Sequence, residues 1–336
     1  MKILIYSPLF YPSLGGVEIV TSILAHEFVN QEHEVKVVSQ VPATNANLFP
    51  FEVIRKPNPL KVLSLIYWCD VYFHANISLK GIWPLLIRPK PWVIAHNGWY
   101  SRPNGTLGWQ DYLKHFFLRF ATGISVSKAV ADHISTPSIV IPNPYCEDIF
   151  YEIPNTIRNR ELVFLGRLVY QKGVDLLLEA LHNLKLVGLT PQLTIIGTGL
   201  EELNLRQQSN ELNINQQVNF VGKKFGNELT ELLNNHKIMV VPSRYQEGFG
   251  LVALEGIACG CVVISSDSGG LKEAVGSCGA TFPNGNVKAL TQILFDLLTN
   301  LDQLSTYREN AEAHLSRHKK ATVAKAYLQV MEKAIQ

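Results

Sequence analysis

The sequence predicts an α/β protein built from two Rossmann-like domains, each a doubly wound parallel sheet. Short apolar runs alternate with amphipathic stretches, which is typical of strands followed by crossover helices. The alternation stops in the polar stretch YEIPNTIRNR at 151–160 and then restarts. A length of 336 residues suits two domains of roughly 150 residues each.

The predicted strands and helices follow in order. Strands are expected at 3–6, 35–38, 71–73, 92–95 and 124–126, then at 162–165, 193–196, 218–221, 238–241 and 262–264. Helical spacing of apolar residues appears at 17–28, 174–187 and 321–335. We expect one domain of 1–155 plus 317–336, to which the last helix returns, and a second of 158–316. Ligands bind beyond the carboxyl ends of such strands, so a central cleft between the domains is the expected site.

Composition excludes several classes of protein. The 30 basic and 28 acidic side chains give a net charge of +2, shared evenly between the halves, so nothing favours nucleic acid. Five cysteines without a CxxC pair favour reduced thiols and a cytoplasmic protein. The N-terminus MKILIYSP turns polar too early for a signal peptide, and no apolar run reaches 18 residues. Any membrane contact is therefore expected to be peripheral, on the inner face.

A glycine pair and a pair of basic residues each follow a predicted strand. Gly15-Gly16 precedes a helix, where backbone amides can approach a phosphate, although a plain loop glycine pair is the alternative. Arg167 and Lys172 follow the first strand of the second domain and are suited to neutralising a diphosphate; a solvated basic turn is the alternative. The pair Gly197 and Gly199 lacks the third glycine of a dinucleotide fingerprint.

Carboxylates and one histidine complete the candidates. The run EGFGLVALE separates Glu247 from Glu255, and both can accept hydrogen bonds from sugar hydroxyls unless they are ordinary surface residues. Glu255 has apolar neighbours and so needs a partner. His96 ends a predicted strand and is either a ligand contact or a structural histidine. No Asp-x-Asp, P-loop or zinc-ligand spacing occurs in the sequence.

Taken together these motifs resemble the retaining glycosyltransferases of family 4, also described as glycosyl transferases group 1, which have the GT-B fold. The matching residues span 1 to about 283 in the family's order: Gly15-Gly16, His96, Ser125-Val-Ser127-Lys128, Ile141-Pro142-Asn143, Gly166-Arg167, Lys172-Gly173, Gly197-Thr-Gly199, Pro242-Ser243, Glu247 to Glu255 and Asp267 to Glu273. The sequence departs from the family at 144–148, where PYCED replaces a commoner Asn-Gly-hydrophobic-Asp.

The resemblance implies a role for each candidate. Arg167 and Lys172 would hold the donor diphosphate, Glu255 the ribose, and Glu247 the transferred sugar. Contacts to the donor would also come from Gly15, Gly16, Gly199, Val221, Gly222, Lys223, Phe249, Gly250 and Leu251. His96 would contact the donor sugar near the reacting carbon, which makes His96, Glu247, Arg167 and Lys172 the expected catalytic residues. Family members retain anomeric configuration and need no metal or cofactor beyond the nucleotide sugar.

The expected function is hexose transfer from a nucleotide-diphosphate sugar, first of all UDP-glucose rather than a GDP- or ADP-sugar. The acceptor would be a saccharide or lipid-linked saccharide, in polysaccharide or glycolipid biosynthesis. It would bind the loop after His96, through Trp99, Tyr100 and Trp109 with Asn97 and Ser101. The stretch 114–120 mixes cations with aromatic residues and suits either a membrane surface or the core. Alternatives are an epimerase or phosphorylase on the same fold, or a non-catalytic sugar-nucleotide-binding subunit.

Overall fold

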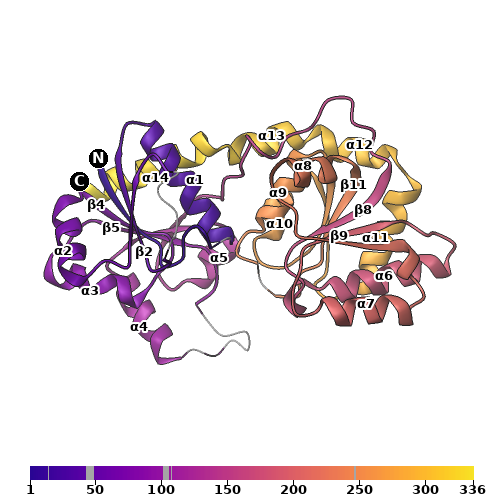
Figure 1. The fold of residues 1–336 in the computed structure, drawn as a ribbon, viewed down its shortest axis with the longest axis horizontal. Helices are drawn as coiled ribbons and strands as arrows, with labels where there is room; N and C mark the ends of the chain where they lie inside the picture. The colour runs from indigo at the N-terminus through magenta and orange to yellow at the C-terminus, as the bar shows by residue number, and fades with distance from the viewer. Residues whose placement is uncertain (14, 43–48, 101–105, 107, 246) are drawn as a thin grey trace. The chain divides into compact units, whose positions relative to one another are not determined.

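The chain is known from a computed structural model that describes residues 1–13, 15–42, 49–100, 106, 108–245 and 247–336. Its described residues divide into two compact units, one of 1–144 with 318–336 and one of 145–317 (Figure 1). Each unit is a parallel sheet covered by helices, so the predicted α/β class with two Rossmann-like domains is confirmed. In the described parts of the chain, no helix combines the length and apolarity needed to cross a bilayer.

The described residues of unit 1 form a seven-stranded sheet in the order β3-β2-β1-β4-β5-β6-β7. Its strands are β1 (Lys2–Tyr6), β2 (Glu34–Ser39), β3 (Glu52–Arg55), β4 (Val71–His74), β5 (Trp92–His96), β6 (Thr122–Ser125) and β7 (Ser138–Val140). In the central register Ile5 of β1 faces Val37 of β2 on one side and Phe73 of β4 on the other. Every residue of β4 and β5 is buried, as expected for strands covered on both faces.

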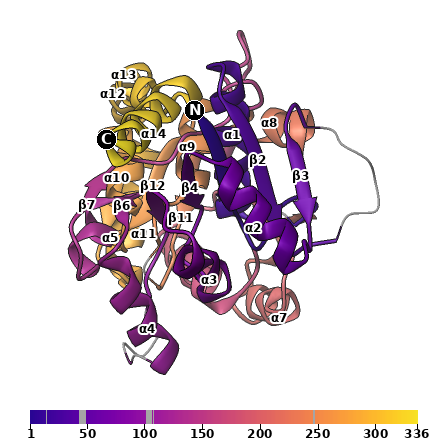
Figure 2. The same ribbon diagram turned by 90° about the vertical axis from the view of Figure 1, so that its left-hand side faces the viewer.

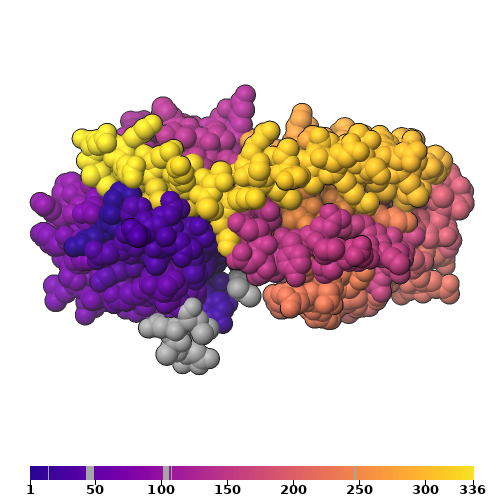
Figure 3. All heavy atoms as spheres, turned by 90° about the horizontal axis from the view of Figure 1, so that it is seen from above, coloured from indigo at the N-terminus to yellow at the C-terminus, as the bar shows by residue number. Residues whose placement is uncertain are grey.

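Helices cover both faces of the unit 1 sheet. They are α1 (Gly16–Asn30), α2 (Pro59–Trp68), α3 (Leu79–Ile87), α4 (Trp109–Leu118), α5 (Lys128–His133) and α14 (Lys320–Ile335). The chain moves from β1 to β2 in one direction and from β3 through β4 to β7 in the other. Because parallel crossovers are right-handed, α1 covers one face and α2 to α5 cover the opposite face. The last helix, α14, packs beside α1 and over β4, β5 and β6. Its outer side lies at the surface of unit 1 beside the indigo N-terminal residues (Figure 3).

Unit 2 repeats this plan. Its described residues form a six-stranded sheet in the order β10-β9-β8-β11-β12-β13. The strands are β8 (Arg160–Leu165), β9 (Leu193–Ile196), β10 (Val218–Gly222), β11 (His236–Val241), β12 (Val262–Ser266) and β13 (Gly279–Phe282). The helices are η1 (Tyr170–Lys172), α6 (Val174–Leu186), α7 (Glu202–Glu211), η2 (Asn215–Gln217), α8 (Gly226–Asn234), α9 (Leu251–Ala258), α10 (Leu271–Val275), α11 (Val287–Thr299), α12 (Asp302–Glu309), α13 (Ala311–Leu315) and η3 (Ser316–His318). Leucines of α6 and α11 pack together in its core.

The boundary between the units falls at Pro144, earlier than the predicted end at residue 155. The polar segment that the sequence suggested as a linker is bonded to unit 2 through α8. Asn234 Nδ2 donates to the carbonyl of Tyr151 (3.0 Å), and the Ile153 amide donates to Asn234 Oδ1 (2.8 Å). Thr230 Oγ1 also donates to the carbonyl of Ile149 (2.7 Å). Side chains far along the sequence thus form hydrogen bonds with the backbone of this segment. The polar composition of the segment does not reveal these bonds.

The packing of α14 predicts the effect of changes at Tyr327. This side chain is fully buried, its ring lies 5.8 Å from that of Phe73, and its hydroxyl has no hydrogen-bond partner among the described residues. Tyr327→Phe should leave the free energy of unfolding unchanged or raise it by up to about 1 kcal/mol, because an unpaired buried hydroxyl is costly. Tyr327→Ala should lower it by about 3–5 kcal/mol, as a large cavity does.

Urea unfolding followed by tryptophan fluorescence measures this difference, since all five tryptophans of the sequence lie in unit 1. A loss of more than about 1 kcal/mol in Tyr327→Phe would mean that the hydroxyl is hydrogen-bonded after all.

Candidate functional site

The strongest candidate site lies where the chain leaves β8 and β11, the two central strands of unit 2. These strands are neighbours, but the chain runs from β8 to β9 and β10 on one side and from β11 to β12 and β13 on the other. Such a reversal leaves a crevice beyond the carboxyl ends of the strands, where open α/β sheets bind ligands. The loops at this switch point are residues 166–173 and the segment that begins at Pro242.

The backbones of these two loops are joined directly. The Arg244 amide donates to the carbonyl of Gln171 (2.9 Å). Gly173 has a φ of 65°, and a Cβ there would overlap the carbonyl oxygen of Pro242. Glycine is therefore required both for its left-handed backbone and for the close approach of the two chains. This contact fixes where the neighbouring Lys172 can lie.

Side chains of the two loops also pair. Arg244 forms an ion pair with Asp175, and its guanidinium lies 4.6 Å from the centroid of the Tyr170 ring. Sequence reasoning missed this group because Arg244 and Asp175 are 69 positions apart. The one local indication in the sequence was the Lys172-Gly173 dipeptide. Its glycine lies in the loop that Arg244 and Asp175 hold in place.

The ion pair between Lys172 and Glu247 lies at the centre of the site. Lys172 Nζ donates to Glu247 Oε1, which also accepts from Ser243 Oγ (2.9 Å). The Glu247 carbonyl accepts from the Gly270 amide (2.8 Å), so its backbone is held as well. Both charged side chains remain about a quarter exposed, at 24% and 23%. Within the described residues Glu247 Oε2 has no partner, so the pair can still bind a polar ligand.

Arg167 lies on the first of these loops and is exposed. In the described part of the chain it forms no ion pair, in contrast to Lys172 on the same loop. The site therefore combines a free guanidinium with a lysine whose charge is shared with a carboxylate. Both are the donors expected for an anionic group with several oxygens.

Glycines and the end of β10 complete this edge of the sheet. Gly199 approaches the carbonyl of Leu168 so closely that a Cβ would overlap it, and the Leu168 amide donates to the carbonyl of Thr198 (3.0 Å). Gly199 thus has a structural reason to be glycine, whether or not it touches a ligand. Val221 and Gly222 end β10, and Lys223 follows them with an exposed side chain. The Gly197 amide donates to the carbonyl of Gly222 (2.8 Å), so the end of β10 is bonded to the loop after β9.

Helix α9 starts at this edge and contains Glu255. Gly250 caps its N-terminus without a side-chain hydrogen bond, Phe249 before it is buried, and Leu251 opens the first turn. Glu255 is half-buried further along α9, and its carboxyl group makes no hydrogen bond within the described residues. Burial raises the pKa of Glu255 to about 7. The sequence analysis expected a hydrogen-bond partner for this carboxylate, and none of the described residues provides one.

His96 lies in the interior of unit 1, at the end of β5, with no exposed surface. Its Nδ1 is 2.8 Å from the Tyr100 hydroxyl, which donates to Asn76 Oδ1 (3.0 Å). This chain places the proton on Nδ1 and leaves Nε2 as an acceptor without a partner, facing Gly123 of β6. Burial lowers the pKa of His96 to about 4, so the ring is neutral. Of the two interpretations of His96, a structural histidine fits these surroundings better than a residue that contacts a ligand.

The sequence suggested the loop after His96 as a sugar platform, but two residues in the described part of this loop are committed to packing. Tyr100 is buried, and Asn97 Nδ2 donates to the carbonyl of Ala75 (2.6 Å), so both residues hold the loop on the sheet. Trp99 is half-buried beside His133, and Trp109 is 69% exposed. Ser101 lies outside the described residues. Buried aromatics of this kind supply packing area, which was the alternative explanation for them.

At the start of α1, Gly15 caps the helix without a side chain and Gly16 opens its first turn. Glu18 reaches back to this point: a Cβ on Gly15 would lie 2.5 Å from its Oε2. A carboxylate at a helix N-terminus is favoured by the helix dipole. Glu18 therefore occupies part of the position in which the sequence predicted a phosphate.

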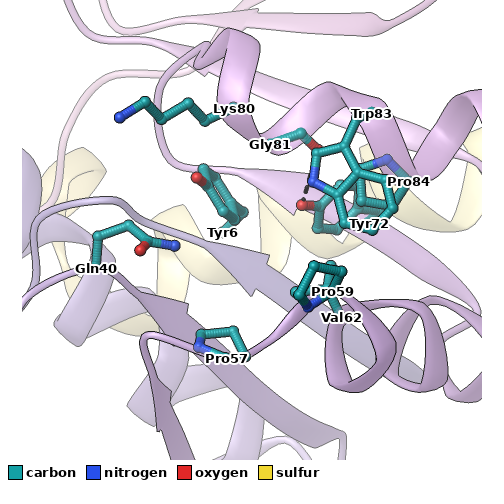
Figure 4. Close-up of a pocket in the computed structure, with 10 residues that line it drawn as sticks. All are labelled: Tyr6, Gln40, Pro57, Pro59, Val62, Tyr72, Lys80, Gly81, Trp83 and Pro84. Atoms are coloured by element: carbon teal, nitrogen blue, oxygen red, sulfur yellow. Dashed lines mark hydrogen bonds between the residues drawn. The ribbon is translucent and has the colours of Figure 1, made fainter.

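A pocket of about 90 Å³ in unit 1 was not predicted from the sequence. It lies at the carboxyl ends of β1, β2 and β3, beside the strand pair β1 and β4 where the chain reverses direction. Its lining combines aromatic, proline and polar side chains: Tyr6, Gln40, Pro57, Pro59, Val62, Tyr72, Lys80, Gly81, Trp83 and Pro84 (Figure 4). Burial raises the pKa of Tyr6, which keeps its hydroxyl protonated as a donor. The residues come from β1, β4, α2, α3 and two loops, and no short motif joins them.

Metal and thiol chemistry receive no support from the described residues. Among them, no group of three or more histidine, cysteine, aspartate or glutamate side chains is arranged to hold a metal ion. All five cysteines are free thiols, and four of them are buried.

Comparison with known proteins adds to this geometry. Residues 151–314 match the family model described as glycosyl transferases group 1. An uncharacterised glycosyltransferase of Methanocaldococcus jannaschii is 30% identical over 208 residues, which are 59% of this chain and 56% of that protein. A glycogen synthase of Mycobacterium tuberculosis is 41% identical over 115 residues, 34% of this chain and 28% of that protein. The chain thus spans about half or less of the length of these curated relatives.

Solved structures resemble the whole chain. Anabaena HepE in complex with UDP superposes with a TM-score of 0.84 at 20% identity, over 99% of this chain and 100% of that one. Sucrose-phosphate synthase of Thermosynechococcus elongatus gives a TM-score of 0.83 at 20% identity, over 99% and 98% of the two chains. At such identities the likeness shows the fold alone, and that fold is the GT-B architecture expected from the sequence.

The pKa of Glu255 predicts a pH-dependent effect on stability. Its folded value of about 7 exceeds the usual 4.5, so the carboxyl favours folding at low pH and loses that contribution as pH rises from 4.5 through 7. Glu255→Gln removes the cost of burying the charge. We expect the variant to gain about 1–2 kcal/mol relative to the native protein between pH 5 and pH 8.

Scanning calorimetry at the two pH values measures this gain. Glu179→Gln, on the exposed side of α6, serves as the control and should show no such pH dependence. Equal behaviour of the two variants would mean that Glu255 keeps an ordinary pKa.

Proposed function

We propose that the protein is a retaining, metal-independent hexosyltransferase of the glycosyl transferases group 1 family, because residues 151–314 match that family's model and the chain has the GT-B fold. The observation that carries the proposal is the Lys172–Glu247 pair, held between the two loops at the switch point of unit 2. Such a pair offers a cation to a diphosphate and a carboxylate to the sugar attached to it.

In this proposal unit 2 holds the nucleotide-sugar donor. Arg167 and Lys172 bind the diphosphate, and the N-terminus of α9, which has no side-chain cap, adds backbone donors at Gly250 and Leu251. Glu247 accepts hydrogen bonds from hydroxyls of the transferred sugar through Oε2, which has no partner among the described residues. Glu255, which lacks a partner in the described protein, accepts from the ribose. A buried carboxylate that needs two donors is matched by the two ribose hydroxyls.

The reaction follows from these contacts. The bond between the sugar C1 and the β-phosphate oxygen breaks, and the acceptor oxygen bonds to C1 on the same face. The acceptor proton passes to the departing phosphate oxygen, so no protein base is required. Arg167 and Lys172 stabilise the negative charge that develops on the diphosphate, which is the largest electrostatic demand of the step. Glu247 faces the positive charge that develops on the sugar.

We take UDP-glucose as the first donor to test. Anabaena HepE, which shares the fold, has been solved with UDP, with UDP and glucose, and with UDP-glucose. The GDP- and ADP-sugars are the comparison set. The expected absence of a metal requirement is supported by a sequence without Asp-x-Asp. We propose that the protein acts in the cytoplasm, in polysaccharide or glycolipid synthesis.

The acceptor is proposed to be a saccharide or lipid-linked saccharide bound by unit 1. The pocket of Figure 4 supports this, because it joins aromatic rings with the polar ends of Lys80 and Gln40. Aromatic faces cover the apolar side of a sugar ring while polar groups bind its hydroxyls. This assignment moves the acceptor from Tyr100 and Asn97, which are committed to packing, to the carboxyl edge of the sheet.

Variants of the switch-point residues test the donor site by calorimetry with UDP. Lys172→Ala and Arg167→Ala should each weaken UDP binding by about 1.5–3 kcal/mol, the worth of a charge-assisted hydrogen bond. Glu247→Gln should keep or improve UDP affinity, because it frees Lys172 from its pair, but it should lower sugar transfer.

Unchanged affinity in both cation variants would remove them from a diphosphate site. Lys237→Ala, on β11 and away from these loops, is the control for loss of a positive charge. A non-catalytic subunit would bind UDP-glucose with the same residue dependence but would neither transfer nor hydrolyse it, so donor hydrolysis separates the two hypotheses.

Lys80 tests the acceptor pocket. Lys80→Ala should lower kcat/KM for transfer by about 10–100-fold, as loss of a charged hydrogen bond does, and leave donor hydrolysis in water unchanged. Lys61→Ala on α2, an exposed lysine that does not line the pocket, should change neither activity. If both lysine variants transfer normally, the pocket does not bind the acceptor.

A further inference from the structure

Helix α4 of unit 1 is amphipathic with its apolar side turned outward. Five large apolar side chains recur three or four positions apart and are exposed: Trp109, Tyr112, Leu113, Phe116 and Phe120 just beyond the helix end. Figures 1 and 2, which view the molecule from directions 90° apart, both show α4 projecting from unit 1 away from the sheet. We call these five side chains the α4 face.

The ionisable residues of α4, which are Asp111, Lys114 and His115, are half-buried and turn toward unit 1. Lys114 pairs with Asp111 at 3.1 Å and lies 5.9 Å from the centroid of the Tyr100 ring. His115 Nδ1 is 3.1 Å from Ser135 Oγ, and only Leu118 of the helix is fully buried. A surface helix of a globular protein normally buries its apolar stripe and exposes its charges. The reversed arrangement leaves a contiguous apolar surface that needs a partner.

Charge identifies the partner. Residues 56–128, which include α2, α3 and α4, carry nine lysines and arginines but two acidic residues, Asp70 and Asp111. The whole chain has a net charge of only +2, so this stretch of the sequence is more basic than the rest. Asp111 is already paired with Lys114 on the inner side, whereas Arg119 is exposed next to the α4 face.

The end of the neighbouring helix has the same character. Leu86 and Ile87 at the end of α3 are 70% and 57% exposed, and Arg88 follows them. Helices α3 and α4 contact each other on this side of the sheet. Apolar side chains interspersed with cations therefore extend across two adjacent helices.

We propose that the α4 face docks unit 1 on the surface of an anionic lipid bilayer. Tryptophan and tyrosine are favoured at the boundary between head groups and acyl chains, phenylalanine and leucine can enter the acyl region, and nearby cations pair with anionic head groups. A second copy of the chain is disfavoured, since a symmetric contact through this face would bring the exposed Arg119 of both copies into one interface. A projecting helix also offers no groove for a peptide. The inference stands on these features of unit 1 and does not depend on the proposed transfer activity.

Co-sedimentation of the full chain with vesicles tests the proposal. The chain should bind vesicles that contain phosphatidylglycerol and phosphatidylcholine at least tenfold more strongly than pure phosphatidylcholine, and added salt should weaken this binding. Phe116→Glu should reduce binding at least tenfold, and Arg119→Glu should reduce it on anionic vesicles. Leu203→Glu on α7 is the matched control, because it adds the same charge at a leucine that is 79% exposed.

A second measurement separates docking from general charge attraction. Vesicles should shift tryptophan emission to the blue in the native protein, and Trp109→Phe should lose most of that shift while it still sediments. Unchanged thermal melting and an unchanged far-UV circular dichroism spectrum of Phe116→Glu would exclude misfolding.

Three results would overturn the proposal. One is a native chain that does not bind anionic vesicles. Another is equal binding by Phe116→Glu and Leu203→Glu. The third is light scattering that shows a dimer abolished by Phe116→Glu, which would assign the face to a second copy of the chain.

Discussion

The close approach of Gly173 to the carbonyl of Pro242 is the constraint on which the unit 2 site depends. It brings the loop after β8 against the loop after β11, where the sheet reverses its winding. The Gln171–Arg244 backbone bond and the Arg244–Asp175 pair then hold the two loops in register. Only with this scaffold does Lys172 meet Glu247, although the two residues lie 75 positions apart. A larger residue at 173 would separate the loops, and the charge pair with them.

The charged residues of the unit 2 site differ in how they are paired, and these differences indicate which ligand groups the site can bind. Lys172 is neutralised by Glu247, Arg167 is unpaired within the described residues, and Glu255 is held in apolar surroundings that raise its pKa to about 7. A ligand with both anionic and hydroxyl groups would satisfy all of these at once. Unit 1 differs, because its buried His96 is neutral and is bonded through Tyr100 to the half-buried Asn76.

The two units also differ in what they present to their surroundings. Unit 2 gathers its candidate site residues at one edge of its sheet, as far as the described residues show. Unit 1 has the pocket at its sheet edge and, separately, the α4 face. The balanced total charge concealed a basic stretch of the sequence, since nine of the twelve basic residues up to Ile157 fall within 56–128. Charge averaged over a domain says little about the charge on one face of it.

The sequence by itself determined the α/β class, the two parallel sheets and the edge at which the unit 2 residues gather. These follow from hydrophobic periodicity and from the position of polar residues after strands, which are local properties. The tertiary structure alone decided that Lys172 pairs with Glu247, that His96 is enclosed beside Gly123, and that α4 turns its aromatic side outward. Periodicity identifies an apolar stripe but does not say which way it faces, because burial and pairing depend on residues that meet only in the folded chain.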